Sequence, residues 1–368
     1  MEQYTGTRTV ASSHAFDIGA LQAYLTQQLP GFAGPLTVEQ FKGGQSNPTY
    51  KLLTPERAYV MRSKPGPAAK LLPSAHAVER EFRVMRALAG TGVPVAQMLL
   101  LCEDEAVIGR AFYIMEFMDG RVLWDQSLPG LDNSERAAIY DEMNRVIAAL
   151  HTVDVVGAGL FDYGRPGNYF DRQIGRWSKQ YIASITEPIA EMDRLMAWLP
   201  EHMPQSARDD TQVSVVHGDF RLDNLVFHKT EPRVIAVLDW ELSTIGHPLA
   251  DFSYHCMAWH IPPGTFRGIG GLDHAALGIP EEAEYVRRYC ERVGDRVGAG
   301  SARQLQPAAL AADWNFYLAY NLFRLASITQ GIAKRVVDGI ASSAQAKATG
   351  ASTRPLAEMA WTFAQKAR

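Results

Sequence analysis

The sequence has few cysteines, and none of them lie in close pairs. Cys102, Cys256 and Cys290 are scattered through 368 residues, so we expect neither a disulfide framework nor a zinc site built on a CxxC motif. An excess of basic residues is also missing, because 36 Lys and Arg stand against 40 Asp and Glu, for a net charge of −4. This balance argues against a nucleic-acid-binding protein, whose surface usually carries a clustered basic surplus.

Long apolar runs are absent as well. The first residues, MEQYTGTRTVASSHAFD, do not contain the apolar core of a secretory signal. The most apolar stretch, residues 314–332, is interrupted by Asn315, Asn321, Arg324 and Gln330. Such a stretch is typical of a buried or amphipathic helix rather than a membrane span. We therefore expect a cytoplasmic protein without a membrane partner.

The first third of the chain has the pattern of a small sheet with one helix. Short runs typical of strands lie at 36–54, 58–62, 98–104 and 111–118. Over 75–88, apolar residues recur at helical spacing instead.

After about residue 118 the pattern becomes mainly helical. Helical spacing dominates over 134–151, over 171–200 and in three further segments from about 280, and one β-rich island interrupts it at 213–240. We therefore predict an α+β fold of two lobes. Residues 1–118 form a small β-rich, nucleotide-binding lobe, and residues 119–368 form a larger, mainly helical lobe for catalysis and substrate binding.

The strongest chemical signal is a set of polar residues in the β-rich island. Asp219 and Asn224 lie five residues apart between apolar strands, and Asp239 ends a second apolar strand fifteen residues later. Phosphoryl transfer needs a carboxylate that takes the proton of the acceptor hydroxyl, and oxygen ligands that hold Mg²⁺ on the phosphates. The Asp-to-Asn spacing is that of the protein-kinase catalytic loop. The alternative is a hairpin whose acidic residues only form turns.

The motif HGDFRLDN at 217–224, followed by the strand that ends in Asp239, resembles the signature of the aminoglycoside phosphotransferase family, which has a protein-kinase-like bilobal fold. The resemblance runs from about residue 36 to 330. GGQSNPTY at 43–50 and DWELSTIGHPLADF at 239–252 are similar to the kinase-like domain that is fused to some acyl-CoA dehydrogenases. The resemblance implies a phosphotransferase that uses ATP and Mg²⁺ to phosphorylate a hydroxyl of a small molecule.

In this family the three polar residues have defined roles. The resemblance implies that Asp219 is the catalytic base and that Asn224 and Asp239 are the metal ligands. It also implies that Gly44, Ser46 and Asn47 belong to the loop that covers the ATP phosphates. A Gly-Gly hairpin turn is the alternative for that loop.

The hinge is expected at the end of the last strand of the small lobe. The resemblance implies that backbone groups of Glu116 and Met118 bind the edge of the adenine ring. Because backbone contacts tolerate many side chains, the residue types at these two positions carry little information.

Arg62 stands where a kinase has the lysine that contacts the α- and β-phosphates. This is a departure from the pattern, because a planar guanidinium does not replace an ammonium group directly. Lys64, two residues further on, points to the same face of an extended strand and is the alternative. Glu81 is the best candidate for the helix carboxylate that positions the basic residue, and Glu79 competes with it from another face.

The acceptor is the least determined part of the prediction. Family members that bind polycationic aminoglycosides carry acidic clusters in the helical lobe, whereas this chain has Arg172, Arg176 and Lys179 in an aromatic run over 169–181. The comparison favours a neutral or anionic acceptor, such as a hydroxyacyl thioester or another small hydroxylated metabolite. The alternatives are an aminoglycoside or choline- or homoserine-type kinase, and a non-catalytic pseudokinase-like binding module. Nothing in the pattern predicts an oligomeric state.

Overall fold

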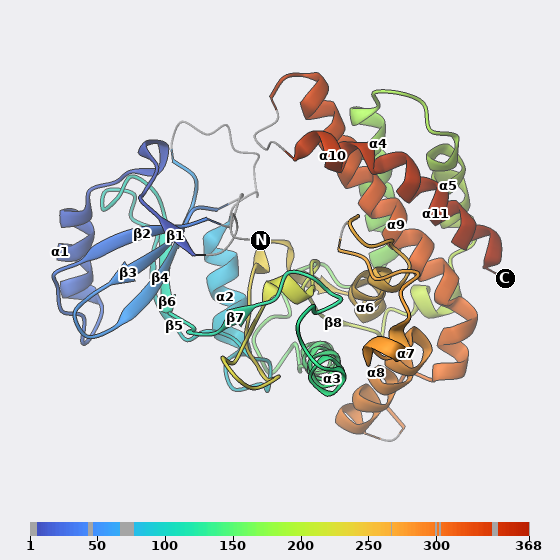
Figure 1. Cartoon of the computed structure of the whole chain (residues 1–368), viewed down its shortest axis with the longest axis horizontal. Coiled ribbons are helices and arrows are strands. Elements are labelled where there is room, and N and C mark those ends of the chain that lie inside the picture. Colours follow the sequence, from blue (N-terminus) through green and yellow to red (C-terminus); the bar gives the residue numbers. More distant parts are fainter. Residues whose placement is uncertain are drawn as a thin grey trace. The chain divides into compact units, whose positions relative to one another are not determined.

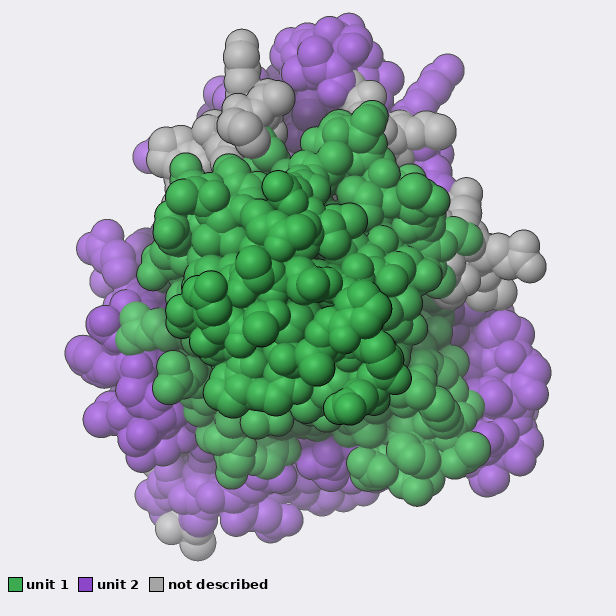
Figure 2. All heavy atoms as spheres, turned by 90° about the vertical axis from the view of Figure 1, so that its left-hand side faces the viewer, with its two compact units in different colours: residues 1–124, 224–243 green, residues 125–223, 244–368 purple. Residues whose placement is uncertain are grey.

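The computed structural model of the chain describes residues 6–42, 47–66, 77–265, 267–298, 300–301, 303–340 and 345–367. The chain forms two compact units, which Figure 2 shows in two colours. Unit 1 comprises residues 1–124 and 224–243, and unit 2 comprises residues 125–223 and 244–368. The β-rich island is thus shared between the units. The predicted lobe boundary at residue 118 stays a prediction.

Unit 1 is built on a six-stranded sheet with the order β1-β2-β3-β4-β6-β5. All of its neighbouring strands are antiparallel, and β4 lies between β3 and β6. The strands are β1 (Thr7–Arg8), β2 (Thr37–Phe41), β3 (Thr49–Leu53), β4 (Ala58–Ser63), β5 (Met98–Cys102) and β6 (Phe112–Glu116). The strands predicted from the sequence are therefore confirmed.

The two faces of this sheet are covered by different helices. Met61 points to one face, where it shares a core with Leu21 of α1 (Ile18–Gln28). Successive side chains of a strand point to opposite faces, so Arg62 points the other way, to the face where α2 (Val78–Leu88) packs. Figure 1 shows α1 and α2 on opposite sides of the sheet. The strand period therefore places the arginine against the helix that was expected to position it.

A second, three-stranded sheet completes unit 1. It has the order β10-β9-β7 and contains β7 (Arg121–Val122), β9 (Leu225–Phe227) and β10 (Val234–Val237). Gly120 precedes β7, and a Cβ atom there would lie 2.3 Å from the carbonyl oxygen of Phe227. Only glycine allows β7 to approach β9 this closely.

Unit 2 is mainly helical, with one small antiparallel sheet of β8 (Ser214–Val216) and β11 (Thr244–Gly246). Its long helix α9 packs against α4, α6, α10 and α11 (Figure 1). The α-helices are α3 (Asn133–His151), α4 (Tyr169–Ser184), α5 (Ala190–Glu201), α6 (Pro248–Cys256), α7 (His274–Leu277), α8 (Glu282–Val297), α9 (Pro307–Val337), α10 (Ala346–Ala351) and α11 (Thr353–Lys366). The predicted α+β fold, with a β-rich part and a larger helical part, is confirmed.

Two expectations about helices need correction. The single helical pattern over 171–200 is two helices, α4 and α5. The backbone leaves the helical conformation at Ile185 (φ −56°, ψ 126°), and Pro188 then disfavours helical backbone at the residue before it. The described C-terminal part has four helices from α8 onward rather than three, since α10 is a short separate helix. A Cβ atom at Gly350 would lie 2.9 Å from the Cα of Ala333, so this glycine lets α10 lie directly on α9.

The apolar stretch of 314–332 lies in α9 and is a buried helix, as predicted. Its polar residues have partners inside the unit; Asn321, for example, donates from Nδ2 to the carbonyl oxygen of Ala250 (3.1 Å). Across the described residues, no helix combines the length and the apolar composition needed to cross a membrane.

The core of unit 2 contains a stack of aromatic rings between α6 and α8. The rings of Phe252 and Tyr289 lie 3.7 Å apart at an angle of 11°, and both side chains are fully buried. We expect Phe252→Ala to lower the free energy of unfolding by about 3–5 kcal/mol, because it leaves a cavity beside Tyr289. Urea unfolding followed by near-UV circular dichroism measures this loss.

Phe161 supplies the matched control, since its ring is 63% exposed in the same unit. Phe161→Ala should change the free energy of unfolding by less than about 0.5 kcal/mol. Equal unfolding midpoints for the two variants would contradict the packing described for Phe252.

Candidate active site

The predicted site residues fall into two groups. The residues predicted for nucleotide and metal belong to unit 1, and the predicted base, Asp219, belongs to unit 2. Gly44 and Ser46 of the predicted phosphate loop lie outside the described residues. Each group is described within its own unit.

Arg62 is the centre of a polar network in unit 1. Its Nε lies 2.9 Å from Oε2 of Glu81, and its Nη2 lies 2.8 Å from Oδ1 of Asp239 and 3.5 Å from Oε2 of Glu241. Asn47 joins the network by donating from Nδ2 to Oε1 of Glu81 (2.8 Å). The structure thus brings together four of the predicted residues, Asn47, Arg62, Glu81 and Asp239.

The two glutamates of α2 have different partners. Glu81 is 1% exposed and pairs with Arg62. Glu79 pairs with Lys64 instead, at 3.0 Å, and both of these side chains are partly exposed. Arg62 and Lys64 therefore do not share a partner, and Arg62 is the one of the two that reaches Asp239.

Burial and pairing act in opposite directions on the Arg62–Glu81 pair. Burial raises the pKa of Glu81 above its ordinary value, while Arg62 lowers it. Burial alone would lower the pKa of Arg62, but Glu81 raises it, so the guanidinium stays charged. A buried lysine gives up its proton far more readily than an arginine. Arginine at this position therefore secures the positive charge.

Asn224 and Asp239 flank the hairpin of β9 and β10. The N–H of Leu238 donates to the carbonyl oxygen of Asn224 (2.8 Å), which ties the two ends of the hairpin together. Asp239 has φ 64° and ψ 59°, a left-handed conformation that is uncommon outside glycine and concentrates at functional sites. An amide oxygen and a carboxylate fit Mg²⁺, which binds through few protein ligands and completes its shell with phosphate oxygens and water.

The hinge positions lie where the strand order predicts. Glu116 is the last residue of β6, opposite Tyr59 of β4, and its N–H donates to the carbonyl oxygen of Gln97 (2.9 Å). Met118 follows two residues later and is half-buried. Their contacts with adenine stay a prediction.

In unit 2, one buried carboxylate holds the predicted catalytic loop. Asp251 accepts hydrogen bonds from the N–H of His217 (2.7 Å) and of Gly218 (2.9 Å), and its Oδ2 lies 3.2 Å from Nε2 of His151. Burial alone would raise the pKa of Asp251, but hydrogen bonds from His151 and His217 outweigh it and lower the pKa. Gly218 has φ +83°, a backbone conformation that favours glycine. Asp251 thus stays ionised and fixes the loop just before Asp219.

The carboxylate of Asp219 is held by two side chains. The phenol of Tyr254 donates to Oδ1 (2.6 Å), and Nε of Arg221 lies 3.0 Å from the same oxygen. Burial raises the pKa of Tyr254 above its ordinary value, so this phenol keeps its proton and remains a donor. The side chain of Asp219 is 16% exposed. Its position suits a base with a fixed orientation.

The aromatic run over 169–181 forms α4, and its apolar residues belong to the core. Trp177 and Tyr181 are buried, whereas Arg176 is exposed. The arginine that is buried in this region is Arg324 of α9, which in the sequence only interrupts an apolar stretch. The signal that could have identified it is that Arg324 is the single charged residue of the apolar stretch 314–332. Tyr254 was missed because nothing in its sequence neighbourhood points to Asp219.

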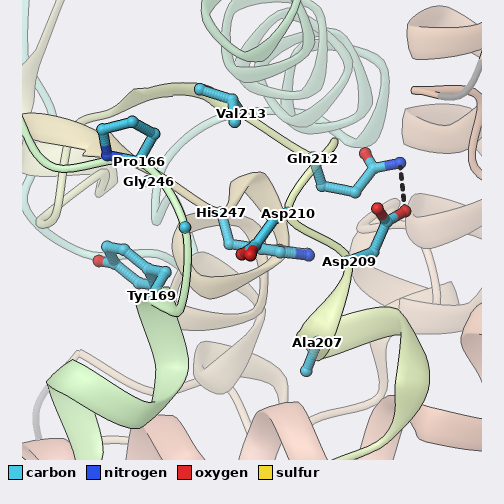
Figure 3. Close-up of a pocket in the computed structure, with 10 residues that line it drawn as sticks. Pro166, Tyr169, Ala207, Asp209, Asp210, Gln212, Val213, Gly246 and His247 are labelled. Atoms are coloured by element: carbon cyan, nitrogen blue, oxygen red, sulfur yellow. Dashed lines mark hydrogen bonds between the residues drawn. The ribbon is translucent and has the colours of Figure 1, made fainter.

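A small hollow lies at the N-terminal end of α6 (Figure 3). Its volume is about 10 Å³, room for a single water molecule at most, so it accommodates neither a nucleotide nor an acceptor. It is lined by Pro166, Gly167, Tyr169, Ala207, Asp209, Asp210, Gln212, Val213, Gly246 and His247.

His247 forms one wall of this hollow and caps α6. Its Nδ1 accepts from the N–H of Leu249 (3.2 Å), and its Nε2 donates to the carbonyl oxygen of Ser206 (2.9 Å). This arrangement requires a neutral imidazole, because a protonated Nδ1 accepts nothing. Burial lowers the pKa of His247 to about 4. The helix that carries Asp251 and Tyr254 therefore starts at a neutral histidine.

The pH dependence of stability tests this cap. The pKa of His247 is about 4 in the folded protein and about 6.5 in an unfolded chain. Between these values the unfolded state binds more protons than the folded state. The contribution of His247 to the free energy of unfolding is therefore complete above pH 6.5 and is lost as the pH falls towards 4. For this one group, the free energy of unfolding changes by at most about 1.4 kcal/mol per pH unit.

We expect His247→Asn, which retains a capping side chain, to have a shallower dependence between pH 4 and 6.5 than the wild type. Urea unfolding at a series of pH values measures the slopes. Between pH 7.5 and 8.5 the imidazole is neutral in both states, and the two proteins should have equal slopes. If the free energy of unfolding of the variant depended on pH between 4 and 6.5 as steeply as that of the wild type, His247 would not be a buried neutral cap.

Comparison with known proteins finds one matching family model and relatives that cover nearly the whole chain. The model of the phosphotransferase enzyme family (APH) matches residues 37–299. Acyl-CoA dehydrogenase family member 10 of Mus musculus is 46% identical over 363 residues, which cover 98% of this chain and 32% of that protein. The chain spans less than half the length of the curated relatives reported for it.

Two crystal structures show the same fold. A protein of Ralstonia eutropha JMP134, provisionally named an aminoglycoside phosphotransferase, is 64% identical with a TM-score of 0.85, and the match covers 96% of this chain and 100% of that one. A thermostable mutant of aminoglycoside phosphotransferase APH(4)-Ia, in a ternary complex with AMP-PNP and hygromycin B, is 17% identical with a TM-score of 0.57 and coverages of 94% and 98%. The second comparison concerns the fold alone.

Proposed function

Because the chain belongs to the phosphotransferase enzyme family, we propose that it uses ATP and Mg²⁺ to phosphorylate a hydroxyl group of a small molecule. The observation that carries this proposal is the environment of Asp219. Tyr254 and Arg221 orient its carboxylate, and Asp251 fixes the backbone of the loop in front of it. A non-catalytic binding module has no need for a base that is held in this way.

The chemistry assigned to Asp219 is general-base catalysis. The acceptor hydroxyl gives its proton to the carboxylate as its oxygen forms a bond to the γ-phosphorus. The bond from that phosphorus to the bridging oxygen breaks, and ADP leaves. Tyr254 and Arg221 hold one carboxylate oxygen, so the carboxylate keeps one orientation when the acceptor binds.

The nucleotide side of the reaction is assigned to unit 1. Asn224 and Asp239 would hold the magnesium ion, which neutralises phosphate charge when it is bound. Arg62 would contact the phosphates, positioned by its ion pair with Glu81. Asn47 braces Glu81, so its part in phosphate binding is indirect in this proposal. Support for an ATP-type nucleotide comes from the AMP-PNP in the APH(4)-Ia complex, which shares the fold.

For the acceptor, we propose a hydroxyacyl thioester or another neutral or anionic hydroxylated metabolite. Support comes from the relatives, which carry the name acyl-CoA dehydrogenase and of which this chain matches one part. An acceptor with a polycationic surface fits poorly beside the basic residues of α4.

Asp219→Asn should reduce phosphoryl transfer by about 10²–10⁴-fold, because the amide cannot take the hydroxyl proton. The nucleotide dissociation constant should change little, since the base acts on the acceptor. Transfer from γ-labelled ATP to a panel of hydroxylated metabolites, including hydroxyacyl thioesters, measures the first quantity, and titration calorimetry with AMP-PNP measures the second. Asp338→Asn, at an exposed ion pair of the same unit, is the matched control. Equal turnover by Asp219→Asn and the wild type would refute the assignment.

Asp239→Ala should abolish the dependence of nucleotide binding on Mg²⁺. The wild type should bind AMP-PNP at least about tenfold more tightly with Mg²⁺ than with EDTA, which is the size expected for a charged contact, while the variant should bind equally in both. Asp119→Ala removes an exposed carboxylate of the same unit and should behave as the wild type. A variant that keeps the full effect of Mg²⁺ would show that Asp239 is not a ligand.

A further inference from the structure

Arg176 and Arg324 of unit 2 form no ion pair with any described residue. Arg324 of α9 is 8% exposed, and within the described part of the chain it makes one hydrogen bond, from Nη2 to the carbonyl oxygen of Gly218 (2.6 Å), and no ion pair. Arg176 of α4 is exposed, and no described residue forms a hydrogen bond or ion pair with it. Burial alone would lower the pKa of Arg324, but nearby tyrosines and Asp219 raise it, so the guanidinium stays charged. A buried guanidinium normally donates to a carboxylate as well, so the N–H groups of Arg324 require an explanation.

The two guanidinium groups share one aromatic ring. Arg176 lies 5.2 Å and Arg324 lies 5.6 Å from the centre of the Trp177 ring. Trp177 is 7% exposed, and its indole N–H has no acceptor among the described residues. Contact with a ring stabilises a cation but leaves its N–H groups without acceptors. Around this ring, the hydrogen bond from Arg324 to Gly218 is therefore the one that these donors make to a described residue.

The positive charge of these arginines also affects the pKa of Tyr169. Burial raises the pKa of Tyr169 to about 12, whereas Arg324, Arg176 and Arg172 lower it. The arginines of α4 and α9 therefore act on one common region rather than on separate surfaces.

This region adjoins the proposed base. The ring of Tyr254 lies 4.9 Å from the guanidinium of Arg324, and its phenol donates to Oδ1 of Asp219 (2.6 Å). A single tyrosine side chain thus spans the interval from Arg324 to Asp219. A ligand group beside Arg324 lies only a short distance from the group that would activate the hydroxyl.

We propose that Arg176, Trp177 and Arg324 form a binding site for an oxyanionic group of the acceptor, a carboxylate or a phosphate. The role of this site in the reaction rests on the proposed function, with Asp219 as base. Guanidinium groups match the paired oxygens of these anions and bind them through charge-assisted hydrogen bonds. This favours the anionic acceptor of the proposed function over a thioester: a small molecule whose oxyanion and reactive hydroxyl are separated by only a few bonds.

Binding of simple anions tests the site without any catalysis. The full chain is labelled with ¹⁵N in its seven tryptophan indoles, and the Trp177 signal is assigned with Trp177→Phe. Sodium acetate or inorganic phosphate is titrated at constant ionic strength against sodium chloride. We expect a saturable shift of the Trp177 indole signal with at least one anion, and the two titrations distinguish a carboxylate site from a phosphate site.

Variants at the two arginines should weaken this response. Arg176→Gln changes an exposed residue and should raise the apparent dissociation constant about tenfold or more, as expected for loss of a charged hydrogen bond. Arg324→Gln should do the same, and Arg324→Lys, which retains the charge, serves if the glutamine variant does not fold. Arg194→Gln is the control, since Arg194 lies 5.7 Å from the ring of Trp361 elsewhere in the same unit. An unmoved Trp177 signal with both anions, or an equal response in Arg176→Gln, overturns the proposal.

Phosphoryl transfer separates this proposal from the proposed function. The wild type should prefer short hydroxy acids or phosphorylated alcohols over the matched neutral diols by about tenfold or more, and Arg176→Gln should lose this preference. Equal transfer to both classes by the wild type overturns the anion site while the phosphotransferase activity stands. A saturable Trp177 shift without transfer to any acceptor supports the anion site and counts against the proposed function.

Discussion

The carboxylate of Asp251 is the buried charge on which the arrangement around Asp219 depends. It has no exposed surface, and it remains ionised because three neighbours, the N–H groups of His217 and Gly218 and the imidazole of His151, direct hydrogen-bond donors at it. Removing such an acceptor would leave two buried backbone donors unsatisfied, each at a cost of about 1–3 kcal/mol. Because those donors belong to the loop immediately before Asp219, the same interaction that stabilises the core also sets the position of the proposed base.

The loop is held from its other side by a cation. Arg324 donates to the carbonyl oxygen of Gly218, while the N–H of the same residue donates to Asp251. The peptide units on either side of this glycine are thus fixed by an anion on α6 and a cation on α9. Tyr254, one turn after Asp251 on α6, then reaches Asp219 itself. Helix α6 therefore controls both the backbone of the loop and the orientation of its carboxylate, and the neutral His247 at its start supports both functions.

Much of this arrangement was predictable from the sequence, and the rest was not, for identifiable reasons. The strands and the fold class followed from local periodicity, since the strand period of two and the helix period of 3.6 decide which side chains can meet. The choice of Glu81 over Glu79 came from the resemblance to the family. Tyr254 and Arg324 escaped prediction because their contacts with Asp219 and Gly218 join residues that are far apart in the chain. Periodicity assigns a residue to a face of its own helix but does not say what packs against that face. The break of 171–200 into two helices was missed because apolar spacing continues through the residues that separate α4 from α5.

Two of the buried arginines, Arg62 in unit 1 and Arg324 in unit 2, have different surroundings. In unit 1, Arg62 faces three carboxylates, those of Glu81, Asp239 and Glu241, and the surplus of negative charge there suits a metal ion. In unit 2, Arg324 contacts a carbonyl oxygen and two aromatic rings, and Arg176 contacts one of the same rings. Neither arginine forms an ion pair with a described residue. Nearby tyrosines and Asp219 raise the pKa of Arg324 against the effect of burial, so the guanidinium stays charged. Its N–H groups that have no carboxylate acceptor suit an anionic ligand. The residues around Arg62 have an excess of negative charge, and Arg324 and Arg176 have an excess of positive charge. We therefore infer ligands of opposite charge, a cation beside Asp239 and an anion beside Arg324.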